Sequence, residues 1–201
     1  MHTIIKRISL IVAVIAALAA GYYFLYWQNT PAFAAGEIQQ AVQKKDYPLF
    51  QKRVDMRRVY SAAVDDALAE LSADGMVEHR LAASLMKGLK RQIVDELIRQ
   101  TEINFKQDEP ADASLLDQPV KTLTAYIGSS ALSLTDVFAV TEKDGIAMAS
   151  IKLHDKKLGK DFVWKVQMEK DPSGLWCATR VINLREYLKE REQLLKKAVT
   201  P

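Results

Sequence analysis

The sequence is poor in the residues that usually build reactive sites. It has one cysteine, Cys177, and three histidines, His2, His79 and His154, that lie far apart in the chain. One cysteine cannot form an intramolecular disulfide, and Cys177 is too far from the N-terminus to carry the lipid of a lipoprotein. No spacing of these residues fits a metal site, and no nucleotide-binding motif is visible. We therefore expect no metal and no cofactor.

The chain also lacks an excess of either charge. It carries 28 Lys and Arg against 25 Asp and Glu, and setting aside Lys6 and Arg7 leaves 26 against 25. This balance argues against a nucleic-acid-binding surface or a polybasic membrane-binding patch. Both signs also mix in the last predicted helix, over 184–199, which indicates a solvated face with i,i+4 ion pairs that includes Arg191.

Charged residues are absent from Ile8 to Trp27, a run of 20 residues that directly follows Lys6 and Arg7. At about 1.5 Å per residue, a helix of this length spans a hydrocarbon core of roughly 30 Å. The run ends in tyrosines and a tryptophan, side chains that favour the headgroup boundary. No acidic residue precedes Glu37, so the basic N-terminus favours a positive-inside orientation.

This pattern predicts a cytoplasmic tail over 1–7, a transmembrane signal-anchor helix over 8–28 and an exported domain over 29–201. The alternative is a cleaved secretory signal, because Ala32-Phe33-Ala34 has the small-x-small pattern of a cleavage site. The apolar core of a signal is usually about 7–15 residues, shorter than this run, so we favour a retained anchor. Export without disulfides fits a protein of the bacterial inner membrane whose domain lies in the periplasm.

The exported part is predicted to be one α+β domain, with helices over 30–127, a sheet over 131–183 and a closing helix over 184–199. The most periodic segment predicts a single two-sided helix from Met76 to Phe105. Its apolar stripe steps by four and should face the core. The stripe comprises Leu81, Leu85, Leu89, Ile93 and Leu97.

The period changes to two after residue 131, which predicts a four-stranded antiparallel meander. The third strand alternates most cleanly, with one apolar face made of Phe162, Trp164, Val166 and Met168. We expect the helix over 76–105 or the closing helix to pack on this face. We interpret the Phe162 and Trp164 stripe as core and not as a ligand cage.

The segment from Ile38 to Asp55, which reads Ile-Gln-Gln-Ala-Val-Gln-Lys-Lys-Asp-Tyr-Pro-Leu-Phe-Gln-Lys-Arg-Val-Asp, carries a family likeness. It resembles a bacterial family of single-span membrane-anchored proteins of unknown function. Members of that family read roughly Ala-Ile-xxx-Asp-xxx-Leu-xxx-Val-Asp just after the anchor. The resemblance implies a membrane-anchored domain and brings no activity with it.

The second likeness concerns the C-terminal half, a meander that ends in Gly174-Leu175-Trp176-Cys177-Ala178-Thr179-Arg180-Val181. It resembles the cone-shaped fold of nuclear transport factor two. Exported single-span proteins with such a domain include assembly subunits of secretion machines. The long predicted helix over 76–105 departs from the usual cone.

Two charged residues of the predicted sheet are weak candidates for catalysis. Asp136 shares strand parity with Leu134 and Phe138, so its carboxylate would face inward, where burial raises the pKa and suits a base. Arg180 would supply the opposite charge of the same pocket. We favour the alternative, in which a twist or bulge in the strand leaves Asp136 in water.

Other polar pairs are interpreted as structural. Neighbours in a strand point to opposite faces, and neighbours on a helix do not face each other, so these pairs are not acid–base dyads. The pairs are His154-Asp155, Asp65-Asp66 and Asp95-Glu96. Asp95 is expected to pair with Arg91 or Arg99, and His79 to lie on the solvated surface.

These observations favour a membrane-anchored extracytoplasmic module for interaction or ligand binding over an enzyme. Its expected partners are the membrane, through residues 8–27, and a protein partner or a second copy, with no nucleic acid. One alternative is a cone-fold enzyme that uses Asp136 as an interior carboxylate. The other is a structural subunit of a secretion or envelope complex.

Overall fold

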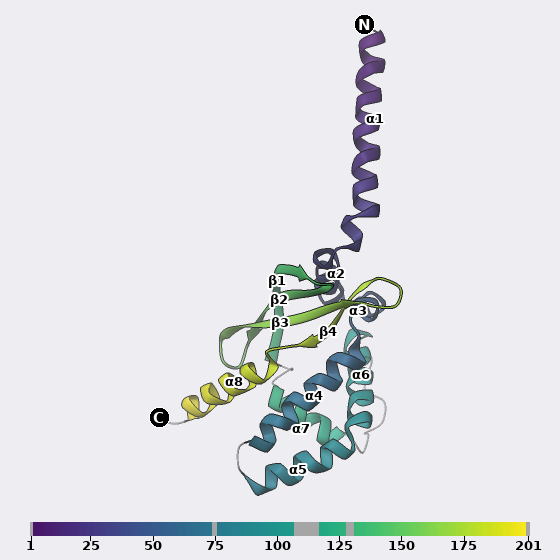
Figure 1. Cartoon of the computed structure of the whole chain (residues 1–201). Coiled ribbons are helices and arrows are strands. Elements are labelled where there is room, and N and C mark those ends of the chain that lie inside the picture. The colour runs from purple at the N-terminus through teal and green to yellow at the C-terminus, as the bar shows by residue number, and fades with distance from the viewer. Residues whose placement is uncertain (1, 74–75, 107–116, 128–130, 200–201) are drawn as a thin grey trace.

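The computed structural model describes residues 2–73, 76–106, 117–127 and 131–199. Helices form the first part: α1 (His2–Leu25), η1 (Trp27–Asn29), α2 (Pro31–Lys44), α3 (Tyr47–Arg53), α4 (Met56–Ala73), α5 (Val77–Gly88), α6 (Lys90–Lys106) and α7 (Asp117–Ile127). Strands β1 (Leu132–Lys143), β2 (Ile146–Asp155), β3 (Lys160–Lys170) and β4 (Trp176–Val181) follow, and α8 (Leu184–Val199) closes the chain. The predicted α+β class and element order are confirmed (Figure 1).

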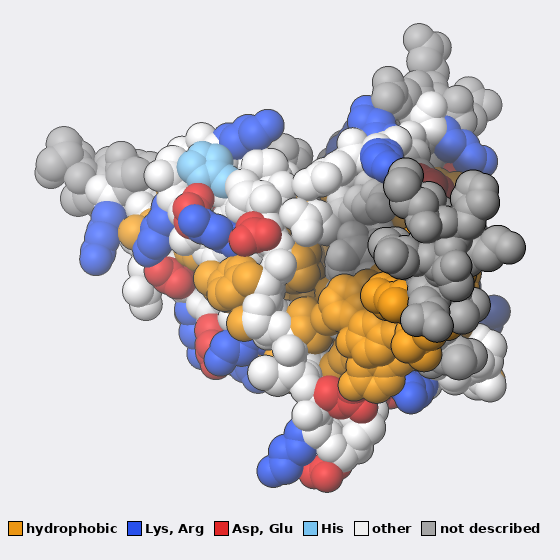
Figure 2. All heavy atoms as spheres, turned by 90° about the horizontal axis from the view of Figure 1, so that it is seen from above, with side chains coloured by type: hydrophobic (Ala, Val, Ile, Leu, Met, Phe, Trp, Pro, Cys, Tyr) orange, Lys and Arg blue, Asp and Glu red, His pale blue; other side chains and the backbone are white. Residues whose placement is uncertain are grey.

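Helix α1 projects away from the rest of the molecule, and α5 lies at the opposite end (Figure 1). The stretch Ile11–Asn29 is long and apolar enough to cross a membrane, and none of it is buried inside the protein. Figure 2 looks down on this end of the molecule and shows hydrophobic side chains gathered on one side, with mixed acidic and basic side chains on the other. The chain therefore has one N-terminal helix that could anchor it in a membrane.

The base of this helix is joined firmly to the sheet. The indole Nε1 of Trp176 in β4 donates to the carbonyl oxygen of Asn29 over 3.0 Å, and Trp176 is 1% exposed. Thr30 then caps α2, because its hydroxyl accepts from the backbone N–H of Phe33 over 3.2 Å. Ala34 is fully buried. Residues 29–34 are thus part of the folded domain as well as the exit from α1.

The single helix predicted from Met76 to Phe105 is wrong, because the chain breaks at Leu89 between α5 and α6. Gly88, the last residue of α5, is the position where a helix is intrinsically weakest. The break turns the leucine stripe of α5 away from the core, so Leu81 is 62% and Leu85 is 73% exposed. Only the α6 part of the stripe is core, where Ile93 is fully buried.

The four strands form an open antiparallel sheet in the order β1-β2-β3-β4. The predicted alternation of β3 is confirmed, since Phe162, Val166 and Met168 are at most 5% exposed, whereas Lys165 is exposed. Helix α8 packs on this face as expected. The ring of Tyr187 meets that of Phe162 at 5.0 Å and that of Trp164 at 5.5 Å between centroids, edge to face.

Candidate functional site: an apolar cavity between the helices and the sheet

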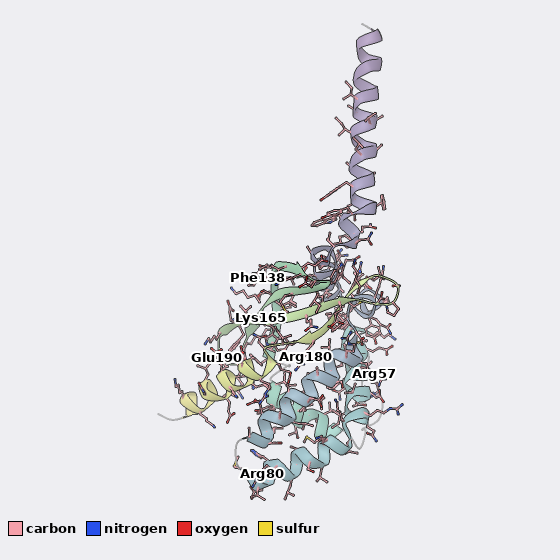
Figure 3. The ribbon with its side chains drawn as sticks, in the orientation of Figure 1. Arg57, Arg80, Phe138, Lys165, Arg180 and Glu190 are labelled. Atoms are coloured by element: carbon pink, nitrogen blue, oxygen red, sulfur yellow. The ribbon has the colours of Figure 1, made fainter. Side chains whose placement is uncertain are left out.

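The two sequence-based candidates for catalysis do not meet. Asp136 lies on β1 and Arg180 on β4, which are opposite edges of the sheet. A register shift between Leu134 and Asp136 breaks the strand parity, so Asp136 is exposed and not interior. Figure 3 shows Phe138, two residues from Asp136, well away from Arg180. The structure therefore shows the favoured interpretation, in which a bulge leaves Asp136 in water, and not the interior carboxylate.

Arg180 instead pairs with a helix residue. Its Nη2 lies 3.2 Å from the Asp66 carboxylate, which is 7% exposed as a residue. Arg57, Arg58 and Arg180 line one surface groove. Each of these arginines is held by its own carboxylate, Arg57 by Asp95 at 2.7 Å and Arg58 by Glu169 at 2.9 Å. The groove has no surplus charge to bind an anion, and the expected pairing of Asp95 within its own helix is wrong.

His154 and Asp155 point to opposite faces, as predicted. His154 Nδ1 lies 2.7 Å from Asp161 on the solvated face, and Lys152 lies 2.8 Å from the same carboxylate. The lysine and then the histidine hold the pKa of Asp161 below its usual range. Asp155 is fully buried and pairs with Arg191. His154 is therefore a surface residue that hydrogen-bonds to Asp161, and its side chain makes no interaction with that of Asp155.

One hollow in the described part of the chain is a cavity of about 440 Å³ with a mostly apolar lining. It lies between α4, α6 and α7 on one side and β3, β4 and the start of α8 on the other. Most of its surface is apolar. Its walls include Val59, Ala63, Leu97, Leu123, Trp164 and Leu184.

The walls of the cavity are rigid core elements. Leu123 and Leu184 are each 1% exposed, and Val64 is fully buried. Helix α8 is tied to the end of α7 by Tyr187, whose hydroxyl donates to the carbonyl oxygen of Ile127 over 2.9 Å. Burial raises the pKa of Tyr187 to about 12, so this phenol keeps its proton at any ordinary pH. The lining residues that the structure describes thus belong to packed helices and strands.

The hydroxyl groups around the cavity are mostly occupied. Thr101 donates to the carbonyl oxygen of Leu97 over 2.8 Å, and Thr124 donates to that of Val120 over 2.8 Å. Since the Thr101 proton is used in this way, Thr101 must accept from the Tyr60 hydroxyl, which lies 2.6 Å away. Burial raises the pKa of Tyr60, so this phenol is also uncharged.

The indole N–H of Trp164 is the exception. Its Nε1 atom is buried but has no hydrogen-bond partner in the part of the chain that the structure describes. Leaving a buried donor unsatisfied costs about 1–3 kcal/mol. The carboxamides of Gln100 and Asn104 line the same cavity. An apolar chamber with a few polar groups is typical of sites for small organic ligands.

Within the described residues, no group of three or more His, Cys, Asp or Glu could hold a metal ion. Cys177 is a buried thiol, and burial raises its pKa, which makes it a poor nucleophile. Cys177 therefore packs in β4, as expected. No protein-family model, curated protein or solved structure matches this chain.

The sequence does not reveal the cavity, because the residues of its walls follow the same apolar pattern as an ordinary core. Val59 and Ala63 belong to the apolar stripe of α4, and Trp164 belongs to the inward face of β3. Ala63, with its small side chain, is one of the residues that line the space.

Proposed function

We propose that this protein is a membrane-anchored module that binds a small apolar ligand in the cavity between α4, α6, α7 and the sheet. The observation that carries the proposal is a largely apolar cavity of about 440 Å³ between packed helices and the sheet. Protein interiors normally leave few voids larger than a water molecule, whereas ligand pockets measure about 300–1,000 Å³. A small apolar ligand would fill this space.

The test compares one neutral apolar probe, 1-ethylnaphthalene, on the full chain and on a cavity-filled variant. Ala63→Phe places a ring in the chamber, and Ala69→Phe is its matched control because Ala69 is exposed on the same helix. Equilibrium dialysis against lipid nanodiscs with and without the protein separates binding from partitioning into lipid. We expect saturable binding by the wild type and Ala69→Phe and none by Ala63→Phe. Equal uptake by all three would refute the cavity as a binding site.

We further propose that the module is held at the outer face of a bacterial inner membrane by a retained signal-anchor. Lys6 and Arg7 before the apolar helix support this orientation. Retention is supported by the role of residues 29–34 in the fold, because cleavage after Ala34 would remove the Thr30 cap and the Asn29 acceptor of Trp176. The resemblance of the segment from Ile38 to Asp55 to a family of single-span anchored proteins also supports a retained anchor.

Topology is tested in bacterial cells with two reporters fused after Pro201. We expect the reporter that works only outside the cytoplasm to be active and the reporter that works only inside it to be silent. The mass of the mature chain should include residues 1–34. A mature N-terminus at Ala35 would show that the domain is released as a soluble protein.

A second candidate function is self-association through the outer face of α5. Leu81 and Leu85, together with Val77 at 57% exposure, form a straight uncharged stripe. Such a stripe is complementary to itself in an antiparallel pair with two-fold symmetry. It would also suit a structural subunit of an envelope or secretion complex. Sedimentation of the full chain in detergent should show a dimer. The double variant Leu81→Gln with Leu85→Gln should be a monomer. A monomeric wild type would contradict this candidate function.

A further inference from the structure

The lining of the cavity changes from polar to apolar between α6 and the sheet. On α6, Asn104 follows Gln100 by four residues and Thr101 by three, a spacing that places them on one face of the helix. Asn104 is exposed and Gln100 is half-buried. On the other side of the cavity, Val181 of β4 and Leu184 of α8 are buried apolar residues. The cavity therefore opens to water near Asn104 and is apolar toward the sheet.

The carboxamide of Asn104 is the polar group at this opening that keeps the most hydrogen-bonding capacity. Gln100 already donates from Nε2 to the carboxylate of Glu96 over 3.1 Å, and the hydroxyls of Tyr60 and Thr101 bind each other at 2.6 Å. The Asn104 side chain makes no hydrogen bond to another residue in the described part of the chain. A carboxamide has two N–H donors and a carbonyl acceptor. Asn104 can therefore both donate to a ligand group at the opening and accept from it.

The cavity also discriminates by charge. Its described lining residues include no Asp, Glu, Lys, Arg or His, and burial raises the pKa of its one ionisable group, the Tyr60 phenol. The Glu96 carboxylate beside Gln100 is paired with Arg99. A carboxylate or ammonium that entered would lose hydration without meeting an opposite charge, which is costly in an apolar interior. An uncharged polar group loses less hydration and finds its partner in Asn104.

We propose that the ligand is an uncharged amphiphile, with an apolar body inside the cavity and an amide or hydroxyl head group beside the Asn104 carboxamide. This inference rests on the proposed function, since it concerns the occupant of the same cavity. The apolar walls supply most of the affinity through burial of the ligand body. Asn104 selects the head group and sets which end of the ligand stays at the opening.

The first experiment compares two probes of nearly equal shape, 1-naphthaleneacetamide and the charged 1-naphthaleneacetate. The protein is the full chain in nanodiscs of zwitterionic phosphatidylcholine, and empty nanodiscs correct for partitioning into lipid. Equilibrium dialysis measures both affinities. We expect saturable binding of the amide and binding of the acetate that is weaker by about tenfold or more, because the acetate must give up the hydration of its charge.

The second experiment tests the role of Asn104. Asn104→Leu keeps the size of the side chain and removes its hydrogen bonds, and Gln92→Leu is the matched control because Gln92 is exposed on the same helix outside the lining. The measured quantity is the ratio of the affinities for 1-naphthaleneacetamide and 1-ethylnaphthalene, in which any effect on the apolar walls cancels. We expect this ratio to fall about fivefold in Asn104→Leu, the effect of one neutral hydrogen bond, and to stay unchanged in Gln92→Leu.

The outcomes separate this inference from the proposed function. The inference is overturned, with the proposed function intact, if the neutral probes bind in the cavity but Asn104→Leu has the same affinity ratio as the wild type. Binding of 1-naphthaleneacetate as tight as that of the amide also overturns it. If neither neutral probe binds saturably, or if Ala63→Phe binds them as the wild type does, the proposed function itself fails.

Discussion

Arg191 of α8 donates from Nε to the carboxylate of Asp155 at the end of β2 over 3.1 Å, and both side chains are buried. The same guanidinium donates from Nη1 to the carbonyl oxygen of Tyr126 in α7 over 3.0 Å. One side chain therefore joins the sheet, α7 and α8, three of the elements that enclose the cavity. The expectation that Arg191 lies on a solvated face is wrong, because its helix turns this position toward the sheet.

Breaking this pair should be costly. Asp155→Asn leaves the buried Arg191 guanidinium without its counter-charge, and we expect the free energy of unfolding to fall by about 3–5 kcal/mol. The matched control is Asp161→Asn, because Asp161 pairs with Lys152 on the solvated surface and should matter much less. Urea denaturation of the full chain in nanodiscs measures both. Equal losses for the two variants would mean that the buried pair does not hold the fold together.

Asp155 should also contribute to the acid sensitivity of the protein. Burial alone would raise its pKa, but hydrogen bonds from Arg191 and from the backbone N–H groups of Leu158 and Lys157 outweigh burial and lower it from the ordinary 3.8. A carboxyl with a lowered pKa stabilises the fold fully above its ordinary value, and that contribution is lost as the pH falls through the folded-state value. The stability gap between wild type and Asp155→Asn should therefore be constant from pH 7 to about 5 and shrink below about 4. A stability difference that grows as the pH falls would contradict this prediction.

Substitution of a buried and of an exposed leucine by alanine should change the stability of the protein by different amounts. Leu123→Ala removes a wall of the cavity that is 1% exposed, and we expect a loss of about 2–5 kcal/mol. Leu85→Ala changes a side chain that is 73% exposed and should cost under about 0.5 kcal/mol. The same denaturation experiment decides between them. A large loss for Leu85→Ala would show that α5 buries its stripe against something.

Trp164 and Lys165 test which way β3 faces. Trp164→Ala removes the ring that packs against Tyr187 and enlarges the cavity, so we expect a loss of roughly 2–5 kcal/mol. Lys165 points to the solvated side of the sheet (Figure 3), and Lys165→Ala should cost under about 0.5 kcal/mol. Midpoints of unfolding that do not differ between these variants would contradict the observed face.

Local features of the fold were predictable from local chemistry. Thr30, Asp46 and Asp55 are residues that favour the N-terminal cap of a helix, and each side-chain oxygen accepts the backbone N–H three residues later. The turn before β4 forms around Asp171, which accepts from the N–H of Ser173. Gly174, at φ 85, takes the left-handed conformation that this turn requires. These signals depend on neighbours in sequence, so the sequence alone reveals them.

The features that failed depend on neighbours in space. A bulge moves Asp136 to water although its strand parity points inward, and nothing in the strand sequence marks the extra residue. The stripe from Leu81 to Leu97 looks continuous, and only the packing of Ala83 against other helices shows that α5 presents its small residue to the core. The cavity is lined by residues of three helices, two strands and the start of α8, and no periodicity in one segment encodes how such elements meet. Core and pocket walls use the same residue types.

The most direct test of the ligand-binding account is where a probe sits when it binds. Nuclear Overhauser effects between bound 1-ethylnaphthalene and methyl groups of the full chain in nanodiscs locate it. We predict contacts to the methyls of Val59, Leu97 and Leu123, which line the cavity. Contacts confined to Leu81 and Leu85, on the exposed face of α5, would contradict the account and make that surface the binding site.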